Sequence, residues 1–263
     1  MKAPGLPRRL LLLFAAALIA VGMGALFQVV GLMSAVERGS VDTRFDVRGA
    51  QGPPADVVLV DIDTRTAGNE NWPINRMHFA KAITELSKAG AGVIVLDVPI
   101  IEESADTDAD NALFEAVAGA KPPVIMTTPE AENGETLIFG GGEGLEASGA
   151  LAASSVLRVE TDDAVRRMGQ AEDGLRTVSF LAAETKLGRP VKPPVREPRI
   201  AFPGPPGTVA HISLADVESG EFKPETVRGK VALIGVNGEY AHTIGDTYDT
   251  PAGTGMAGPA GVS

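Results

Sequence analysis

Two aspartates, Asp61 and Asp63, carry the clearest chemistry in this sequence, because they directly follow the apolar residues at 57–60. One carboxylate of such a pair can attack phosphorus while the other handles the leaving-group proton, as in a magnesium-dependent phosphatase. That enzyme also needs a lysine and further acids for the metal, and the nearest second acidic site, at 245–249, does not directly follow a hydrophobic strand. We therefore favour a structural role, in which the aspartates cap helices and bind loop amides. An exported phosphatase using Asp61 and Asp63 remains the alternative.

Three further aspartates, Asp106, Asp108 and Asp110, alternate as in part of a calcium-binding loop. The glycine and the terminal glutamate that such a loop needs are absent, so the start of a helix is the favoured interpretation. The chain has no cysteine, and its three histidines are far apart in the sequence: His78, His211 and His242. No metal site, disulfide framework or cofactor is therefore predicted.

The elements that must position these residues follow from the pattern of apolar side chains. Continuous apolar runs between turn residues predict buried strands at 57–62, 93–96, 124–127 and 231–236, and a further strand is expected at 155–160. Apolar residues spaced by three and four predict helices over 77–89 and 108–117. The alternation of strands and helices predicts an α/β domain with a mainly parallel sheet flanked by helices.

The carboxyl ends of parallel strands share one edge of a sheet, and we expect a binding site at that edge. The candidate ligand-binding residues are Asp63, Trp72, Arg76, Asp97 and Asp246. Arg76 also allows a structural interpretation, in which it pairs with one of these acids and stabilises the fold instead of holding a ligand. No catalytic set is predicted.

Residues 10–36 form a run without any charged side chain, between Arg9 and Glu37. As a helix, this run is long enough to cross a hydrocarbon core of about 30 Å, so we predict a membrane anchor. The basic residues before it predict a cytoplasmic N-terminus and export of the residues after the anchor. A cleaved signal peptide is the competing interpretation, because Met33-Ser34-Ala35 supplies small residues near the end of the run.

The exported part is strongly acidic. It holds all 34 acids but 20 of the 23 basic side chains, so its net charge is −14. This charge argues against nucleic acid or anionic lipid as a partner. The predicted organisation is a cytoplasmic tail at 1–9, the anchor at 10–36, one extracytoplasmic domain at 37–251 and an irregular tail rich in glycine and proline at 252–263.

Several segments follow one another in a recognisable order: Asp42 to Phe45, Trp72 to Arg76, Asp162 to Arg167, Phe202 to Pro205, Gly229 to Gly235, Asp246 and Thr250-Pro251. Behind an N-terminal anchor, this order resembles the second CHASE family, the sensory extracellular domains associated with cyclases and histidine kinases. The resemblance covers roughly residues 42–262. It implies a non-enzymatic domain on the outer side of a bacterial inner membrane that detects an unknown small ligand or partner protein.

Members of that family usually continue into further membrane helices and a cytoplasmic output domain, such as an adenylate cyclase or a kinase. The chain stops at Ser263, within what resembles the last family motif, so we expect a fragment without its output domain. The resemblance leaves the oligomeric state open, and a dimer is compatible with it. A periplasmic adaptor module without a ligand is the third hypothesis, beside the sensor and the phosphatase.

Overall fold

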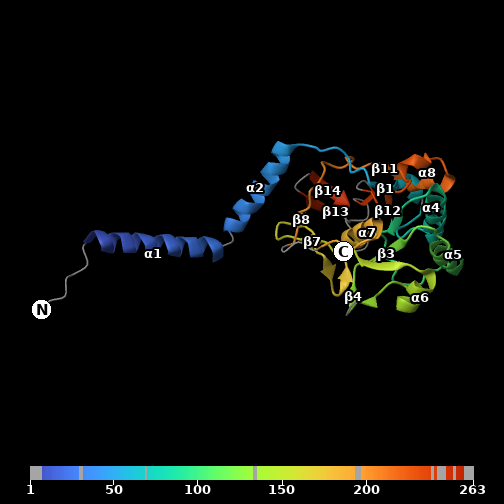
Figure 1. Ribbon diagram of the computed structural model, residues 1–263, viewed down its shortest axis with the longest axis horizontal. Coiled ribbons are helices and arrows are strands. Elements are labelled where there is room, and N and C mark those ends of the chain that lie inside the picture. The colour runs from blue at the N-terminus through green and yellow to red at the C-terminus, as the bar shows by residue number, and fades with distance from the viewer. Residues whose placement is uncertain are drawn as a thin grey trace. The chain divides into compact units, whose positions relative to one another are not determined.

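Figure 1 shows the computed structural model of the 263-residue chain. The structure describes residues 8–29, 32–68, 70–132, 135–192, 197–237, 240–241, 247–250 and 253–257. The chain divides into two compact units, Met1–Gly49 and Ala50–Ser263.

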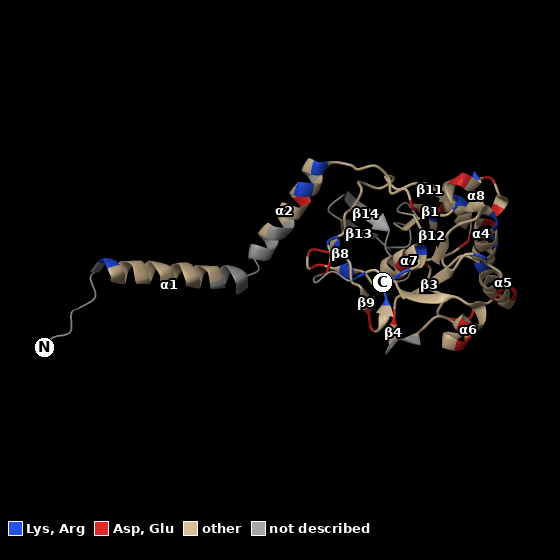
Figure 2. Ribbon diagram, in the orientation of Figure 1, with Lys and Arg blue, Asp and Glu red and all other residues tan. Residues whose placement is uncertain are grey.

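The first unit contains two helices, α1 (Arg8–Val29) and α2 (Leu32–Arg48). The sequence predicted one helix over 10–36. In the structure, α2 begins inside this run and continues through the charged residues that follow it. In Figure 2, α1 carries basic colour at its start and none further along. Among the described residues, no helix combines the length and the apolar character needed to cross a membrane, so the predicted anchor finds no support here.

The second unit is built on a six-stranded sheet in which all neighbouring strands are parallel. The strand order is β11 (His211–Ser213), β1 (Val57–Ile62), β12 (Val231–Val236), β2 (Val93–Leu96), β3 (Val124–Thr128) and β6 (Leu151–Ser154). This arrangement confirms the predicted α/β class with a mainly parallel sheet. It also places β12, from late in the chain, between β1 and β2.

Helices cover both faces of this sheet (Figure 1). The helices that follow β1, β2 and β11 are α4 (Arg76–Ala89), α5 (Thr107–Ala118) and α8 (Leu214–Ser219). Their apolar side chains form the main core together with Ile94 and Leu96 of β2. The alternate residues Val93 and Val95 instead pack with α7 (Val178–Leu187). Successive side chains of a strand point to opposite faces, so β2 is buried on both sides.

Shorter elements complete the unit. Two helices and a 3₁₀ turn are α3 (Thr64–Ala67), α6 (Gly141–Ser148) and η1 (Pro224–Thr226). The two-stranded antiparallel ladders are β4 (Ala131–Glu132) with β5 (Glu135–Thr136), β7 (Arg158–Val159) with β8 (Val165–Arg167), β9 (Ala171–Glu172) with β10 (Leu175–Arg176), and β13 (Thr247–Thr250) with β14 (Gly253–Ala257).

The last of these ladders corrects one prediction. Residues 252–263 were expected to be irregular, yet Gly253–Ala257 pairs with β13 as a strand. A ladder is held by backbone hydrogen bonds, so a segment rich in small residues can join it without apolar side chains.

Gly92 lies directly before β2, where the backbone passes close to the residues before β12. A β carbon there would lie 2.7 Å from the carbonyl oxygen of Gly229. We expect Gly92→Ala to lower the free energy of unfolding by about 1–3 kcal/mol, because backbone must move to make room. Urea unfolding of the purified chain measures this change.

The control is Gly142→Ala, in the first turn of α6, where nothing lies within 4 Å of the added β carbon. Its stability should be unchanged or slightly raised, because alanine favours helix. Equal stability of the two variants would contradict the close approach at Gly92.

Candidate functional site

Asp63, directly after β1, is the N-cap of the short helix α3. Its Oδ1 accepts hydrogen bonds from the backbone N (2.8 Å) and the hydroxyl (2.9 Å) of Thr66. Burial acts to raise the pKa of Asp63, but the hydrogen bonds from Thr66, together with Ser213 and the charge of Arg65, hold this pKa below its ordinary value. The predicted ligand-binding residue therefore serves the capping role that sequence reasoning favoured for strand-end aspartates.

Asp61 lies within β1 and is only 13% exposed. Its Oδ2 is 3.0 Å from Nδ1 of His211 on the neighbouring strand β11. Desolvation raises the pKa of Asp61 above its ordinary value, although His211 partly offsets the effect. Across the described residues, no group of three or more histidine, aspartate and glutamate side chains is placed to hold a metal ion. The described part thus supplies no ligand set for the magnesium that the phosphatase hypothesis needs.

Asp97 follows β2 and accepts a hydrogen bond of 2.9 Å from the hydroxyl of Thr127 on β3. Desolvation raises the pKa of Asp97 to about 6, although the residue as a whole is only partly buried. Gly235 of β12 pairs in register with Asp61 and also lies beside Asp97. Because one strand separates them, Asp61 and Asp97 are roughly 10 Å apart.

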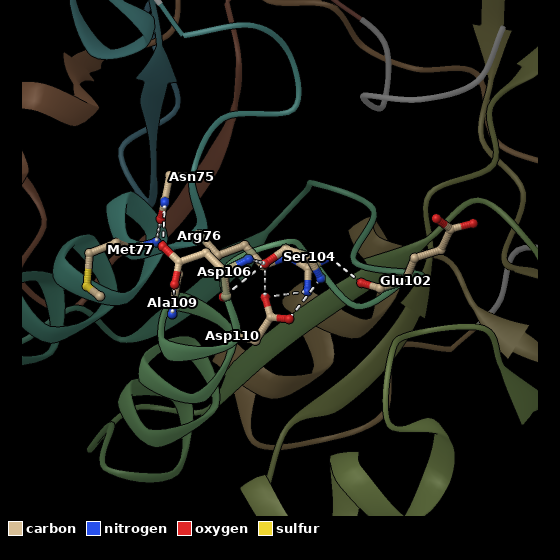
Figure 3. A network of polar contacts seen from close by, with 8 residues as sticks. All are labelled: Asn75, Arg76, Met77, Glu102, Ser104, Asp106, Ala109 and Asp110. Atoms are coloured by element: carbon tan, nitrogen blue, oxygen red, sulfur yellow. Dashed lines mark hydrogen bonds and ion pairs between the residues drawn. The ribbon is translucent and has the colours of Figure 1, made fainter.

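Arg76, the first residue of α4, makes the most buried ion pair among these candidates. Its Nη1 is 2.7 Å from Oδ1 of Asp110 on α5, and the two side chains are 11% and 4% exposed. Nη2 donates to the carbonyl oxygen of Glu102 (Figure 3). Asp110 also accepts hydrogen bonds from the backbone N (2.8 Å) and the hydroxyl (2.7 Å) of Ser104. Every polar atom of the Asp110 carboxyl is therefore bound.

The structural interpretation of Arg76 is thus supported, but its partner is neither Asp63 nor Asp97. The acid is Asp110, because α5 packs beside α4 and turns its first residues toward the start of α4. Burial acts to raise the pKa of Asp110, but the hydrogen bonds from Ser104 and the charge of Arg76 hold it below its ordinary value.

Asn75 links the starts of the same two helices. Its Oδ1 accepts from the backbone N of Met77 at 2.8 Å and so caps α4. Its Nδ2 donates to Oδ2 of Asp106 at 2.9 Å, while Oδ1 of Asp106 accepts from the backbone N of Ala109 and caps α5 (Figure 3). The acids at 106–110 therefore begin a helix, as the sequence favoured.

Trp72 lies apart from this network. It is partly buried against the main core and meets Tyr240 edge to face, with ring centroids 6.2 Å apart. Asp246, the fifth candidate, lies outside the described residues. The four described candidates each have a partner of their own, and no contact joins them into one site.

The alternation of side chains along the strands explains this separation. Val95 packs with α7, and Asp97 continues that alternation on the same side. Leu96 belongs to the core on the other side, which α4 covers and where Arg76 begins the helix. The sheet itself therefore separates the carboxyl of Asp97 from Arg76.

A cleft of about 640 Å³ opens beside Arg76 and, of the four described candidates, includes this residue alone. One wall comes from the segment that leads into α4, and the other from the loop between β2 and α5. The lining residues are Glu70, 73–76, Phe79 and 98–106. Sequence reasoning missed the loop at 98–106. The sequence pattern that could have indicated this loop is the end of an apolar strand followed closely by Ile101-Glu102-Glu103. In the structure these three residues are exposed.

The wall that contains Glu70 is tied to the rest of the domain by His78 on α4. Nε2 of His78 is 3.2 Å from Oε1 of Glu70, and Nδ1 is 2.6 Å from Oε1 of Glu218 on α8. The hydrogen bond with Glu218 raises the pKa of His78 against the opposing effect of desolvation. Oε2 of Glu70 also accepts from the backbone N of Asn75 at 2.8 Å. The position of Glu70 is therefore fixed by two contacts.

Removing Arg76 tests the buried ion pair. Arg76→Ala leaves the carboxylate of Asp110 buried without its cation, so the free energy of unfolding should fall by about 3–5 kcal/mol at pH 7. Asp110→Asn should lower the free energy of unfolding by part of this amount. Because the pKa of Asp110 is lowered in the fold, its contribution is present above its ordinary value of 3.8 and is lost as the pH falls through the folded value. Urea unfolding between pH 7 and pH 3 follows both effects.

The control is the exposed ion pair of Lys88 with Glu85, whose side chains are 65% and 30% exposed. Glu85→Gln should change stability by less than about 0.5 kcal/mol. A similarly small change for Arg76→Ala would contradict the structural role of the buried pair.

Asp97→Asn tests the raised pKa of Asp97. The folded state keeps this proton up to about pH 6, whereas the ordinary value is 3.8, so the contribution to stability falls as the pH rises through that window. Asparagine removes this dependence. Relative to the wild type, the variant should gain up to about 3 kcal/mol between pH 4 and pH 7 in urea unfolding.

Asp56→Asn serves as the control, because Asp56 is exposed and lies before β1. Its free energy of unfolding should differ from that of the wild type by less than about 0.5 kcal/mol, as is usual for an exposed position. Parallel stability profiles for Asp97→Asn and the wild type would show that Asp97 is not desolvated.

Comparisons with known proteins identify the chain. The model of the CHASE2 domain matches residues 13–262. No curated protein and no solved structure matches the chain. The family match covers nearly the whole chain, including both walls of the cleft. It agrees with the resemblance of the sequence to the second CHASE family. The chain therefore belongs to the CHASE2 domain family, a family of sensory extracellular domains.

Proposed function

We propose that this chain supplies the signal-input part of a bacterial membrane signalling protein and senses a small ligand or a partner protein without catalysing a reaction. The observation that carries the proposal is the match to the CHASE2 domain over residues 13–262, because that family consists of sensory domains. An output domain, such as a cyclase or a kinase, would convert the signal into a chemical reaction. A dimer is one assembly through which the sensory domain could pass the signal to that output domain.

The cleft beside Arg76 supports a role in ligand detection. Its volume, about 640 Å³, falls in the range of small-molecule sites. Its two walls precede different helices, α4 and α5, which pack against each other. A ligand that contacts both walls can favour one arrangement of these helices over another, which is the requirement for a ligand to shift a conformational equilibrium.

We also propose an orientation for the chain in the membrane. The N-terminus lies in the cytoplasm, residues 10–36 cross the inner membrane, and the domain after them lies outside the cytoplasm. Two features of the sequence support this. The run at 10–36 has no charged side chain, and the basic residues Lys2, Arg8 and Arg9 precede it.

Cysteine labelling tests this orientation, because the natural chain has no cysteine. We expect Lys121→Cys, at an exposed position between α5 and β3, to react with a membrane-impermeant maleimide on intact cells whose outer membrane has been permeabilised. Lys2→Cys, in the N-terminal segment, should react only after the inner membrane is broken.

Labelling of both variants after lysis, followed by gel analysis, shows that each cysteine is able to react. If Lys121→Cys stays unlabelled until lysis, the domain lies in the cytoplasm and the proposed extracytoplasmic sensor is wrong.

A further inference from the structure

We infer that the cleft between residues 70–76 and the loop at 98–106 binds a small organic cation with an apolar body, such as an amidinium or a primary ammonium compound. This inference rests on the proposed sensory function and names the class of ligand that would be sensed. The residues that line the cleft, and the partners they already have, carry the argument.

Charge is the first property that selects the ligand. Four acidic side chains line the cleft: Glu70, Glu102, Glu103 and Asp106. Among the described residues of the lining, Arg76 is the one cationic side chain, and Asp110 neutralises it at 2.7 Å. Arg76 also donates to the carbonyl oxygen of Glu102, so its second nitrogen is engaged as well. The described part of the lining therefore gives the cleft a negative potential and offers no free cation to an anionic ligand.

The starts of α4 and α5 also border the cleft, and a helix N-terminus by itself favours an anion. Both starts are already capped, however. Asn75 accepts from the backbone N of Met77, and Asp106 accepts from that of Ala109. These caps reduce the attraction for an anion, so the acidic lining decides the preferred charge.

Glu102 and Glu103 are the carboxylates best placed to receive a cation. Both are exposed, and within the described part of the chain their side chains make no hydrogen bond or ion pair. Glu70 and Asp106, in contrast, already accept hydrogen bonds from the protein. A ligand cation would therefore pair with Glu102 or Glu103 without breaking an existing contact.

The apolar part of the lining distinguishes an organic cation from a metal ion. Ile101 is 47% exposed and lines the cleft together with Pro73 and Pro99. Over the described residues, no three acidic or histidine side chains converge as metal ligands. An apolar body can cover the exposed Ile101 while its charged group reaches a glutamate, so both features of the lining are used.

Three probes with the same ring and different charge test the inference on the full chain in detergent. Benzamidinium is cationic, benzamide is neutral and benzoate is anionic. We expect benzamidinium to raise Tm by about 5 °C at a concentration near 100 times its Kd. Calorimetric titration should give it a Kd at least about tenfold below that of benzamide, and benzoate should not bind.

The variant is Glu102→Gln with Glu103→Gln, which removes two exposed charges and should leave the fold intact. It should weaken benzamidinium binding at least about fivefold and leave benzamide unchanged. The matched control is Glu143→Gln with Glu146→Gln on α6, where both residues are exposed and neither lines the cleft. This control should bind benzamidinium as the wild type does.

Three results would overturn the inference: no binding of benzamidinium, tighter binding of benzoate than of benzamidinium, or equal loss of binding in the variant and the control. Cysteine labelling of Lys121→Cys separates this outcome from failure of the proposed function. A cytoplasmic domain that still binds benzamidinium through Glu102 and Glu103 would retain the cation site and lose the extracytoplasmic sensor.

Discussion

The ion pair of Arg76 with Asp110 is the contact on which the shape of the site depends. It joins the first turn of α4 to the first turn of α5, and Ser104 and Glu102 bring the loop before α5 into the same network. Two buried charges are expensive to desolvate unless hydrogen bonds satisfy their remaining polar atoms. Here the planar guanidinium donates through two nitrogens, Nη1 to the carboxylate of Asp110 and Nη2 to the carbonyl oxygen of Glu102, whereas a lysine would have to reach both from one nitrogen.

This network also determines what the cleft can bind. Because Asp110 and the carbonyl oxygen of Glu102 bind the guanidinium of Arg76, this cation is not available to a ligand. The acidic side chains of the lining therefore determine the electrostatic potential of the cleft. By holding Ser104, the network fixes the loop whose outer residues, Ile101 to Glu103, face the cleft. The positions of the exposed glutamates therefore depend on an ion pair that no ligand needs to touch.

The sequence was sufficient for most of the sheet. Strands β1, β2 and β12 match their predicted bounds, and β3 is one residue longer, because continuous apolar runs between turns are typical of buried parallel strands. The edge strand β6, at Leu151–Ser154, was not predicted, and of the strand expected over 155–160 only the short β7, Arg158–Val159, forms. The Ala-Ala-Ser composition of β6 gives little strand signal, so only its pairing with β3 defines it.

The site was less predictable for a geometrical reason. Sequence order indicated correctly that Asp63 and Asp97 directly follow strands β1 and β2, but not on which face of the sheet each candidate residue lies. The late strand β12 also lies between β1 and β2, which separates Asp61 from Asp97. The sequence placed Asp110 at the start of a helix but did not indicate that it pairs with Arg76. The two residues are 34 positions apart, and only the packing of α4 against α5 brings them together.

Hydrogen exchange at the backbone amide of Ser104 tests the central claim most directly. This amide donates to Oδ2 of Asp110, so it reports whether the ion pair holds the loop in place. Comparison of the wild type with Asp110→Ala, at a temperature where both are folded, should show much faster exchange at Ser104 in the variant and unchanged exchange in β2 and β12. Equal protection of Ser104 in both proteins would contradict the claim that this ion pair shapes the cleft.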